Sequence, residues 1–208
     1  MYVCRLAPAC TGVTADWLAT GSDRYTVTVT EAAGSAAVLR ETVSGCTVTV
    51  TGLCPDTEYA LQMETMEGRR SRSRRFRTGA VAGTVVNYLH PQNGCHGFSG
   101  SCLCSPSLVR HPDGYLLAGM DVFGHGTPQN LTLLYRSDDE GRHWRYVSKL
   151  MPCFWVRLFI HRGGTACAGV CHRIWRSADR ALGGWRCHLW AADGAAAGQR
   201  QDELSRSP

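Results

Sequence analysis

The stretch that decides the fold is Ser137-Asp138-Asp139-Glu140-Gly141-Arg142-His143-Trp144. The Asp139 side chain can accept hydrogen bonds from the backbone N–H groups of a tight turn, as aspartates do in Asx turns. Gly141 can adopt the positive φ that a Cβ would penalise. Trp144 can bury a large apolar ring where the chain leaves the turn. We therefore predict a hairpin turn at these eight residues.

The flanking segments extend this hairpin, because residues 131–136 (LTLLYR) and 145–150 (RYVSKL) both have the composition of strands. The turn fits the pattern S-x-D-x-G-x-x-W, which resembles the Asp box (BNR repeat) of sialidase-like β-propellers, with His143 where Thr is usual. In that family the box is a structural turn between the last two strands of a blade, and it is not a catalytic site. The resemblance implies four structural turn residues: Ser137, Asp139, Gly141 and Trp144.

The composition of the 208 residues indicates an all-β chain of one or two domains, since short Thr-, Val- and Leu-rich runs alternate with Gly, Pro, Asp and Ser turns. The net charge of +5 is too small to demand a nucleic-acid partner. No run of 18 apolar residues is present, so we expect no membrane span. The first residues lack a signal-peptide core: either the protein stays inside the cell, or its true start lies upstream. We favour the extracellular alternative.

Eleven cysteines form a high and odd count. A secreted domain would pair most of them and leave one over. The cluster Cys95, His96, Cys102 and Cys104 offers zinc-ligand side chains, but its C-H-x5-C-x-C spacing does not match the usual paired knuckles. We therefore predict small apolar or disulfide-paired cysteines here, with no metal and no cofactor.

The first eighty residues contain strands with period-two alternation, at residues 24–30 and 46–51, and a shorter strand at 14–17. Residues 52–59 read Gly-Leu-Cys-Pro-Asp-Thr-Glu-Tyr, which resembles the G-L-x-P-x-T-x-Y signature of fibronectin type III modules. The resemblance covers residues 3–79 and implies that Leu53 fills the core. It also implies that the Tyr59 hydroxyl bonds back to the upstream backbone as a tyrosine corner.

Residues 69–75 (RRSRSRR) form a basic stretch near the end of this module. One interpretation is a contact for an anionic polymer. Because no aromatic residues are interleaved, we favour the other interpretation, a solvated loop and strand edge.

Residues 80–103 are expected to be a linker and entry loop. Strands are then predicted at residues 105–110, 115–121, 131–136 and 144–150, which together make a four-stranded propeller blade. Residues 154–162 would open a second blade. We therefore assign residues 104–162 to an incomplete sialidase-like propeller, with one full blade and part of another.

Residues 163–208 lack strand alternation and are expected to form a disordered or aberrant tail. A reading frame shifted by one nucleotide from Gly164 permits a second Asp box, S-E-D-G-G-A-T-F. Trp175, Trp185 and Trp190, by the residues that follow them, each force a glycine in that frame. We therefore expect a frame disruption near Gly163, which truncates the propeller.

Sialidases use an arginine triad, an Asp acid and a Tyr nucleophile assisted by Glu. Their first arginine lies in an R-I-P motif, and the matching place here is Cys104-Ser105-Pro106. The loop after the second strand contains no carboxylate, although His125 and Gln129 could contact sugar hydroxyls. Asp121 is the nearest acid: it either lines the propeller axis or is an exposed residue at a strand end.

No catalytic residue can be assigned. The resemblance implies the N-terminal fragment of a carbohydrate-active, sialidase-like propeller protein with a fibronectin module, itself inactive. The alternative is a non-catalytic protein that binds a glycan or another protein, as in adhesion.

Overall fold

We analysed a computed structural model of the chain. It describes residues 2–34, 36–93, 96, 100–127, 129–151 and 153–161, and the backbone of three later strands. The chain is all-β in this part, with antiparallel sheets, and divides into two compact units, Met1–Gly97 and Phe98–Pro208. The strands are β1 (Val3–Ala9), β2 (Gly12–Trp17), β3 (Arg24–Glu31), β4 (Ala37–Ser44), β5 (Thr47–Thr51), β6 (Glu58–Thr65), β7 (Arg74–Arg77), β8 (Cys102–Arg110), β9 (Leu116–Phe123), β10 (Leu131–Ser137), β11 (Arg145–Leu150), β12 (Phe154–His161), β13 (Gly164–Cys171), β14 (Ile174–Ala181) and β15 (Gly184–Ala191).

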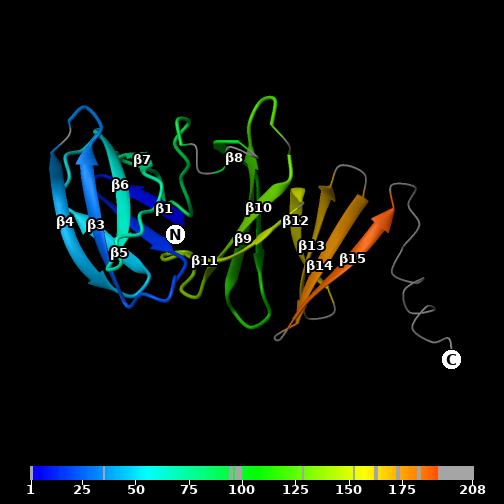
Figure 1. Cartoon of the computed structure of the whole chain (residues 1–208). Helices are drawn as coiled ribbons and strands as arrows, with labels where there is room; N and C mark the ends of the chain where they lie inside the picture. The colour runs from blue at the N-terminus through cyan, green and yellow to red at the C-terminus, as the bar shows by residue number, and fades with distance from the viewer. Residues whose placement is uncertain are drawn as a thin grey trace. The chain divides into compact units, whose positions relative to one another are not determined.

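The first unit is a sandwich of two sheets, with strand orders β1-β2-β5 and β4-β3-β6-β7 (Figure 1). Strands β3, β5 and β6 alternate between buried and less buried residues, because one face of each strand lies on the core. The core draws Leu6, Val13 and Trp17 from one sheet and Val27 and Leu61 from the other. The strands predicted at residues 14–17, 24–30 and 46–51 are therefore present, as β2, β3 and β5.

The segment before β6 is fixed by a local hydrogen bond. The Tyr59 hydroxyl accepts the backbone N–H of Cys54 at 3.0 Å, and Leu53 is buried in the core. Both contacts agree with the expectation from the sequence. The ring of Tyr59 also stacks on Phe76 of β7, with centroids 5.6 Å apart. This corner therefore anchors the entry to β6 against the neighbouring strand.

Two buried arginines attach the segment that follows β7 to this sandwich. Arg74 is 1 % exposed, and its guanidinium donates to the carbonyl of Val3 at 2.6 Å and to that of Tyr88 at 2.9 Å. Arg5 pairs with Asp16 at 3.1 Å and donates to the carbonyl of Val86 at 2.7 Å. The interpretation of residues 69–75 as a solvated stretch is thus wrong at Arg74.

We call residues 85–93 the strap. Two of its asparagines accept hydrogen bonds from backbone N–H groups of the sandwich strands. Asn87 Oδ1 accepts the N–H of Leu6 at 2.9 Å, and Asn93 Oδ1 accepts the N–H of Arg75 at 2.8 Å. Unpaired N–H groups on strand edges invite pairing with other chains, so these contacts protect the sandwich. The first unit consequently runs to Gly97, and the strap is part of it, whereas the sequence suggested a linker from residue 80.

The second unit contains two four-stranded antiparallel sheets, ordered β11-β10-β9-β8 and β12-β13-β14-β15 (Figure 1). One face of β12 packs on the first of these sheets, through Val156 and Leu158. A Cβ added to Gly119 of β9 would lie 2.9 Å from Val156 Cγ1 and 3.4 Å from Leu158 Cδ1. Gly119 therefore leaves the space in which Val156 of β12 packs against the backbone of β9.

The strands predicted in this unit are present with small shifts at their ends. The expectation that no strands follow Gly163 is wrong for residues 164–191, where β13, β14 and β15 form consecutive hairpins on β12. Backbone hydrogen bonding is available to any sequence without proline, and this segment has none. The end of the expected tail, residues 192–208, lies outside the described residues.

We expect a fragment of residues 1–97 to unfold cooperatively and a fragment of residues 1–79 to be markedly less stable. The shorter fragment removes the carbonyl partners that the strap gives to Arg5 and Arg74, and each buried group left unsatisfied costs about 1–3 kcal/mol. Urea unfolding followed by circular dichroism measures the difference. Replacing the exposed Val81 by alanine in the longer fragment is the control and should change nothing. Equal stability of the two fragments would show that the strap is a dispensable linker.

Candidate functional site

The four predicted turn residues come together between β10 and β11. The N–H of Gly141 donates to Ser137 Oγ at 2.8 Å, and that hydroxyl donates to Asp139 Oδ1 at 2.8 Å. Asp139 Oδ1 also accepts the backbone N–H of His143 at 2.9 Å. The Trp144 indole is 8 % exposed and donates to the carbonyl of Gly141 at 3.0 Å. The turn is thus closed by its own side chains.

Backbone geometry explains the glycine in this turn. Gly141 has a φ of 84°, as expected, and its neighbour Glu140 has a φ of 61°. Two successive residues in the left-handed region are typical of tight hairpin turns. Glu140 tolerates this conformation while its carboxylate pairs with Arg110 of β8, at 2.6 Å for one of the two contacts.

Each acid of the turn has a basic partner. Asp138 pairs with Arg136 and with Arg145, the latter at 3.5 Å, and Asp139 Oδ2 lies 2.5 Å from His143 Nδ1. Hydrogen bonds from the His143 backbone N–H and side chain lower the pKa of Asp139 to about 2. Each of the three acids is therefore paired with a basic side chain, and this arrangement stabilises structure without offering a proton donor.

Asp121 lies inside β9 and is fully buried, with 0 % exposure. The interpretation as an exposed residue at a strand end is therefore wrong. Its Oδ1 accepts the hydroxyl of Thr132 on β10 at 2.5 Å. Burial raises the pKa of this carboxyl, and hydrogen bonds from the Thr132 hydroxyl, the backbone of Val156 and Trp155 and the Ser105 side chain oppose the rise. A buried carboxyl of this kind is a recognised feature of functional sites.

Two irregular strands lie on either side of Asp121. The pairing of β8 with β9 shifts between Cys104 and Ser107, and that of β12 with β13 shifts between Phe154 and Arg157. Within these shifts Ser105 has a φ of 48° and Trp155 a φ of 53°. A left-handed conformation is unusual for any residue with a Cβ, and especially for a bulky one. Bulges of this kind often redirect a side chain near a functional site.

Trp155 presents its indole to solvent, with 63 % of the residue exposed, whereas the adjacent Phe154 is buried. The rings of Phe123, Phe154 and Trp155 follow one another, with centroids 6.2 Å and 6.0 Å apart. This aromatic row is formed where β9 ends and β12 begins. The exposed ring of Trp155 therefore lies beside the buried ring of Phe154 in the second unit.

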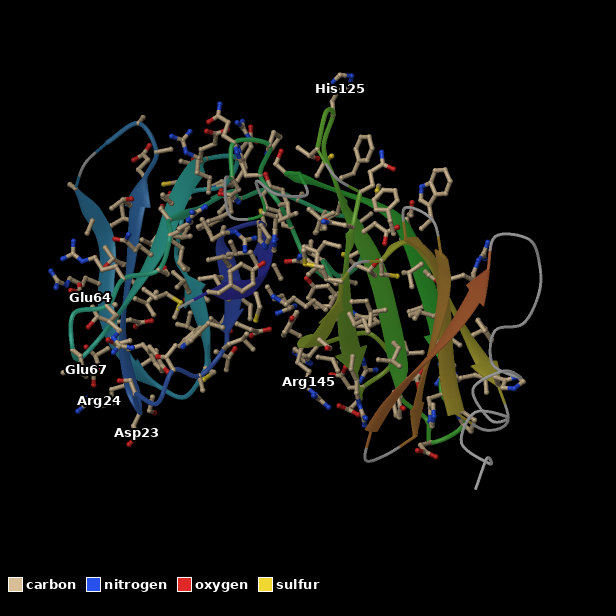
Figure 2. All side chains as sticks on the ribbon, turned by 45° about the vertical axis from the view of Figure 1, so that its right-hand side comes forward. Asp23, Arg24, Glu64, Glu67, His125 and Arg145 are labelled. Carbon is tan, nitrogen blue, oxygen red and sulfur yellow. The ribbon has the colours of Figure 1, made fainter. Side chains whose placement is uncertain are left out.

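The remaining predicted site residues are not gathered into one site. His125 is exposed at the tip of the loop between β9 and β10, where Figure 2 shows its ring pointing away from the sheet. Gln129 is exposed in the same loop. Residues 104–106, where the resemblance placed the sialidase arginine motif, lie in the bulge of β8.

The predicted cysteine cluster is partly described. Cys95 lies outside the described residues, and within those residues no three His, Cys, Asp or Glu side chains are grouped to hold a metal ion. Cys102 and Cys104 form no disulfide there. Cys102 instead donates its thiol to the carbonyl of Phe123 at 3.0 Å.

Sequence reasoning missed Thr132 and Trp155. Thr132 occupies a strand position that pattern alone assigns to an ordinary apolar or β-branched residue. For Trp155 a signal exists in the run Phe154-Trp155-Val156, since three successive large apolar residues cannot all face one side of a regular strand.

No protein-family model matches the chain, and no curated protein shows significant similarity to it. In the described part of the chain, no helix is long and apolar enough to cross a membrane.

We expect Asp139 to make the hairpin turn sensitive to acid. Because its folded-state pKa is about 2, below the ordinary 3.8, ionised Asp139 stabilises the fold above pH 4, and this contribution disappears as the pH falls toward 2. Asp139→Asn keeps an acceptor for the His143 N–H and should lose this pH dependence. Asp139→Ala should also lower the melting temperature at pH 7.

Calorimetry of the full chain between pH 2 and pH 7 measures both effects, with exposed Asp23→Asn in the first unit as the charge-matched control (Figure 2). An Asp139→Asn profile parallel to that of the parent chain would contradict a role for the charge. An unchanged melting temperature in Asp139→Ala would contradict the role of the hydrogen bonds.

Proposed function

We propose that the chain is the N-terminal part of a carbohydrate-active, sialidase-like propeller protein with a fibronectin type III module. In this proposal the chain itself holds a glycan and does not hydrolyse sialosides. A frame disruption near Gly163 remains our prediction for the origin of the incomplete propeller.

The position of the Asp-box turn is the observation that carries the proposal. The turn joins β10 and β11, the last two strands of a four-stranded antiparallel sheet whose strands follow one another in chain order. A second four-stranded sheet follows it, and β12 packs on the first. Such repetition of four-stranded sheets is typical of propeller blades.

The first unit supports the fibronectin assignment. Its sheets of three and four antiparallel strands, and the hydrogen bond from the Cys54 N–H to the Tyr59 hydroxyl, fit a module of this class. We assign no chemistry to this unit.

The absence of hydrolysis follows from the residues around Asp121. A general acid must reach the leaving-group oxygen of the substrate, and the Asp121 carboxyl is fully buried. Residues 104–106 supply no arginine for a substrate carboxylate. The described part of this unit thus lacks two elements that the sialidase reaction needs.

Trp155 is our candidate for glycan contact. Its indole is exposed although its backbone is in an unfavourable left-handed conformation, which costs on the order of 1–3 kcal/mol. An exposed aromatic face can pack on the C–H groups of a sugar ring. Separately, the loop between β9 and β10 carries the exposed His125 and Gln129, whose side chains can donate to sugar hydroxyls.

Protein binding is the second candidate. Leu108, Met151 and Trp155 are each at least half exposed on the second unit. Exposed large apolar side chains of this kind also mark contacts with other proteins.

A glycan array with the purified full chain tests the proposal, followed by calorimetric titration of the best ligand. We expect Trp155→Ala to weaken binding about tenfold or more, equivalent to about 1.4 kcal/mol. Met151→Ala removes a comparable exposed apolar group in the same unit and should leave affinity unchanged. A fluorogenic sialoside should not be turned over.

Two results would contradict the proposal. Turnover of the sialoside that disappears in Asp121→Asn would identify a working acid. Absence of any glycan ligand, together with a protein partner whose binding needs Trp155, would favour adhesion.

A further inference from the structure

The start of β12 departs from regular strand pairing. Its register against β13 shifts between Phe154 and Arg157, so Trp155 and Val156 together face a single position on β13. An extra residue of this kind disrupts the hydrogen-bond ladder locally. Buried backbone N–H groups in such a segment are costly unless another acceptor is supplied.

The side chain of Asp121 supplies this acceptor. The backbone of Trp155 and Val156 donates to its carboxyl group, and so does the hydroxyl of Ser105. The Thr132 hydroxyl donates to Oδ1 at 2.5 Å. Backbone N–H groups can only donate, whereas the two oxygens of a carboxyl group can accept several hydrogen bonds at once. Four donors therefore converge on one fully buried side chain.

Two of these donors belong to residues in an unfavourable backbone conformation. Ser105, in the bulge of β8, has a φ of 48°, and Trp155, in the bulge of β12, has a φ of 53°. Residues with a Cβ remain in this left-handed region only where surrounding contacts hold them there. The hydrogen bonds to Asp121 are such contacts, because they reach both residues.

The chain just before the β12 bulge is fixed to β10 as well. The Thr132 hydroxyl lies 3.3 Å from the carbonyl oxygen of Cys153, and the N–H of Cys153 donates to the carbonyl of Asn130 at 2.9 Å. Thr132 is also the residue that faces Asp121 in the strand register. The pair Asp121 and Thr132 thus contacts the backbone on both sides of Phe154.

The bulge changes the direction of the Trp155 side chain. Adjacent side chains of a regular strand point to opposite faces of the sheet. The ring centroids of Phe154 and Trp155 are nevertheless only 6.0 Å apart, and that of Phe123 lies 6.2 Å from Phe154. The left-handed conformation therefore brings the indole beside the ring of Phe154, while 63 % of Trp155 remains exposed.

We propose that Asp121 is a positioning residue for Trp155: its carboxyl group holds the β12 bulge and thereby sets the direction of the exposed indole. The direction of the indole follows from the contacts described above, whereas its use in glycan contact rests on the proposed function. Because Asp121 is fully buried, it acts through the backbone of Trp155 and does not touch the ligand.

Asp121→Asn tests this role with a side chain of nearly the same volume. Asparagine keeps one acceptor oxygen and replaces the other by an NH2 group, which cannot accept from the backbone of Trp155 or Val156. We expect the amide protons of these two residues to exchange about tenfold faster or more in the full chain, because buried donors lose their acceptor. Nuclear magnetic resonance of the exchanging amides measures the difference.

The direction of the indole can be measured by fluorine magnetic resonance of the full chain labelled with 5-fluorotryptophan. The resonance that disappears in Trp155→Phe belongs to Trp155. In the parent chain the soluble nitroxide TEMPOL should broaden this resonance strongly. In Asp121→Asn it should shift or split, whereas the resonance of Trp144 in the hairpin turn should stay unchanged.

Substitutions of Thr132 separate positioning from simple packing. Thr132→Val has nearly the same shape but lacks the hydroxyl that donates to Asp121, so it should move the Trp155 resonance in the same direction as Asp121→Asn. Thr132→Ser keeps the hydroxyl and should retain the parent resonance. Asp23→Asn, in the other unit, controls for a general effect of charge.

Two outcomes would overturn the proposal. Unprotected amides at Trp155 and Val156 in the parent chain would show that Asp121 does not hold the bulge, and this measurement needs no substituted chain. Parent exchange rates and a parent Trp155 resonance in a folded Asp121→Asn chain would show that the indole is directed by other contacts. If both measurements agree with the proposal but no glycan binds, only the proposed function fails.

Discussion

The second unit depends on the close approach of β12 to the backbone of β9 at Gly119. Any side chain at that position would collide with Val156. The approach brings Val156 and Leu158 onto the sheet β8–β11 and creates the small core they share with Leu134. It also places the start of β12 against the buried pair Asp121 and Thr132.

The first unit is a small sandwich whose sheet edges need to be covered. The strap is attached to these edges by hydrogen bonds from two buried guanidinium groups. Arg5 and Arg74 reach from β1 and β7 to carbonyl groups of the strap. A planar guanidinium with several donors suits this purpose, because it can satisfy carbonyls from separate segments at once. Each buried charge then depends on the strap for part of its hydrogen bonding.

The features that could be predicted from the sequence are those whose contacts are local. The hairpin turn at residues 137–144 is closed by residues within eight positions of one another, and the Tyr59 hydrogen bond to Cys54 spans five. The residue types in these short segments are therefore sufficient to predict the hydrogen bonds. The strands beside them were predictable for the same reason, since alternation reflects a single buried face.

Features that depend on distant partners could not be predicted. Arg74 belongs to a basic run that looks solvated, and only β1 and the strap, fourteen or more positions away, explain its burial. Strand β4 shows no alternation because most of its residues are exposed on both faces. The burial of Asp121 depends on β12, which follows it by some thirty residues. Strands β13–β15 were not predicted because their backbone hydrogen bonds do not require alternating apolar and polar residues.

The most direct test of this account is a double-mutant cycle between Gly119 and Val156 in the full chain. Gly119→Ala should destabilise the second unit by about 1–3 kcal/mol through overpacking. In Val156→Ala, which removes the colliding methyl groups, the same change at Gly119 should cost much less, and Gly79→Ala in open space should cost little in either background. Additive losses, or a Gly119→Ala chain as stable as the parent, would mean that β12 does not pack on β9 as described.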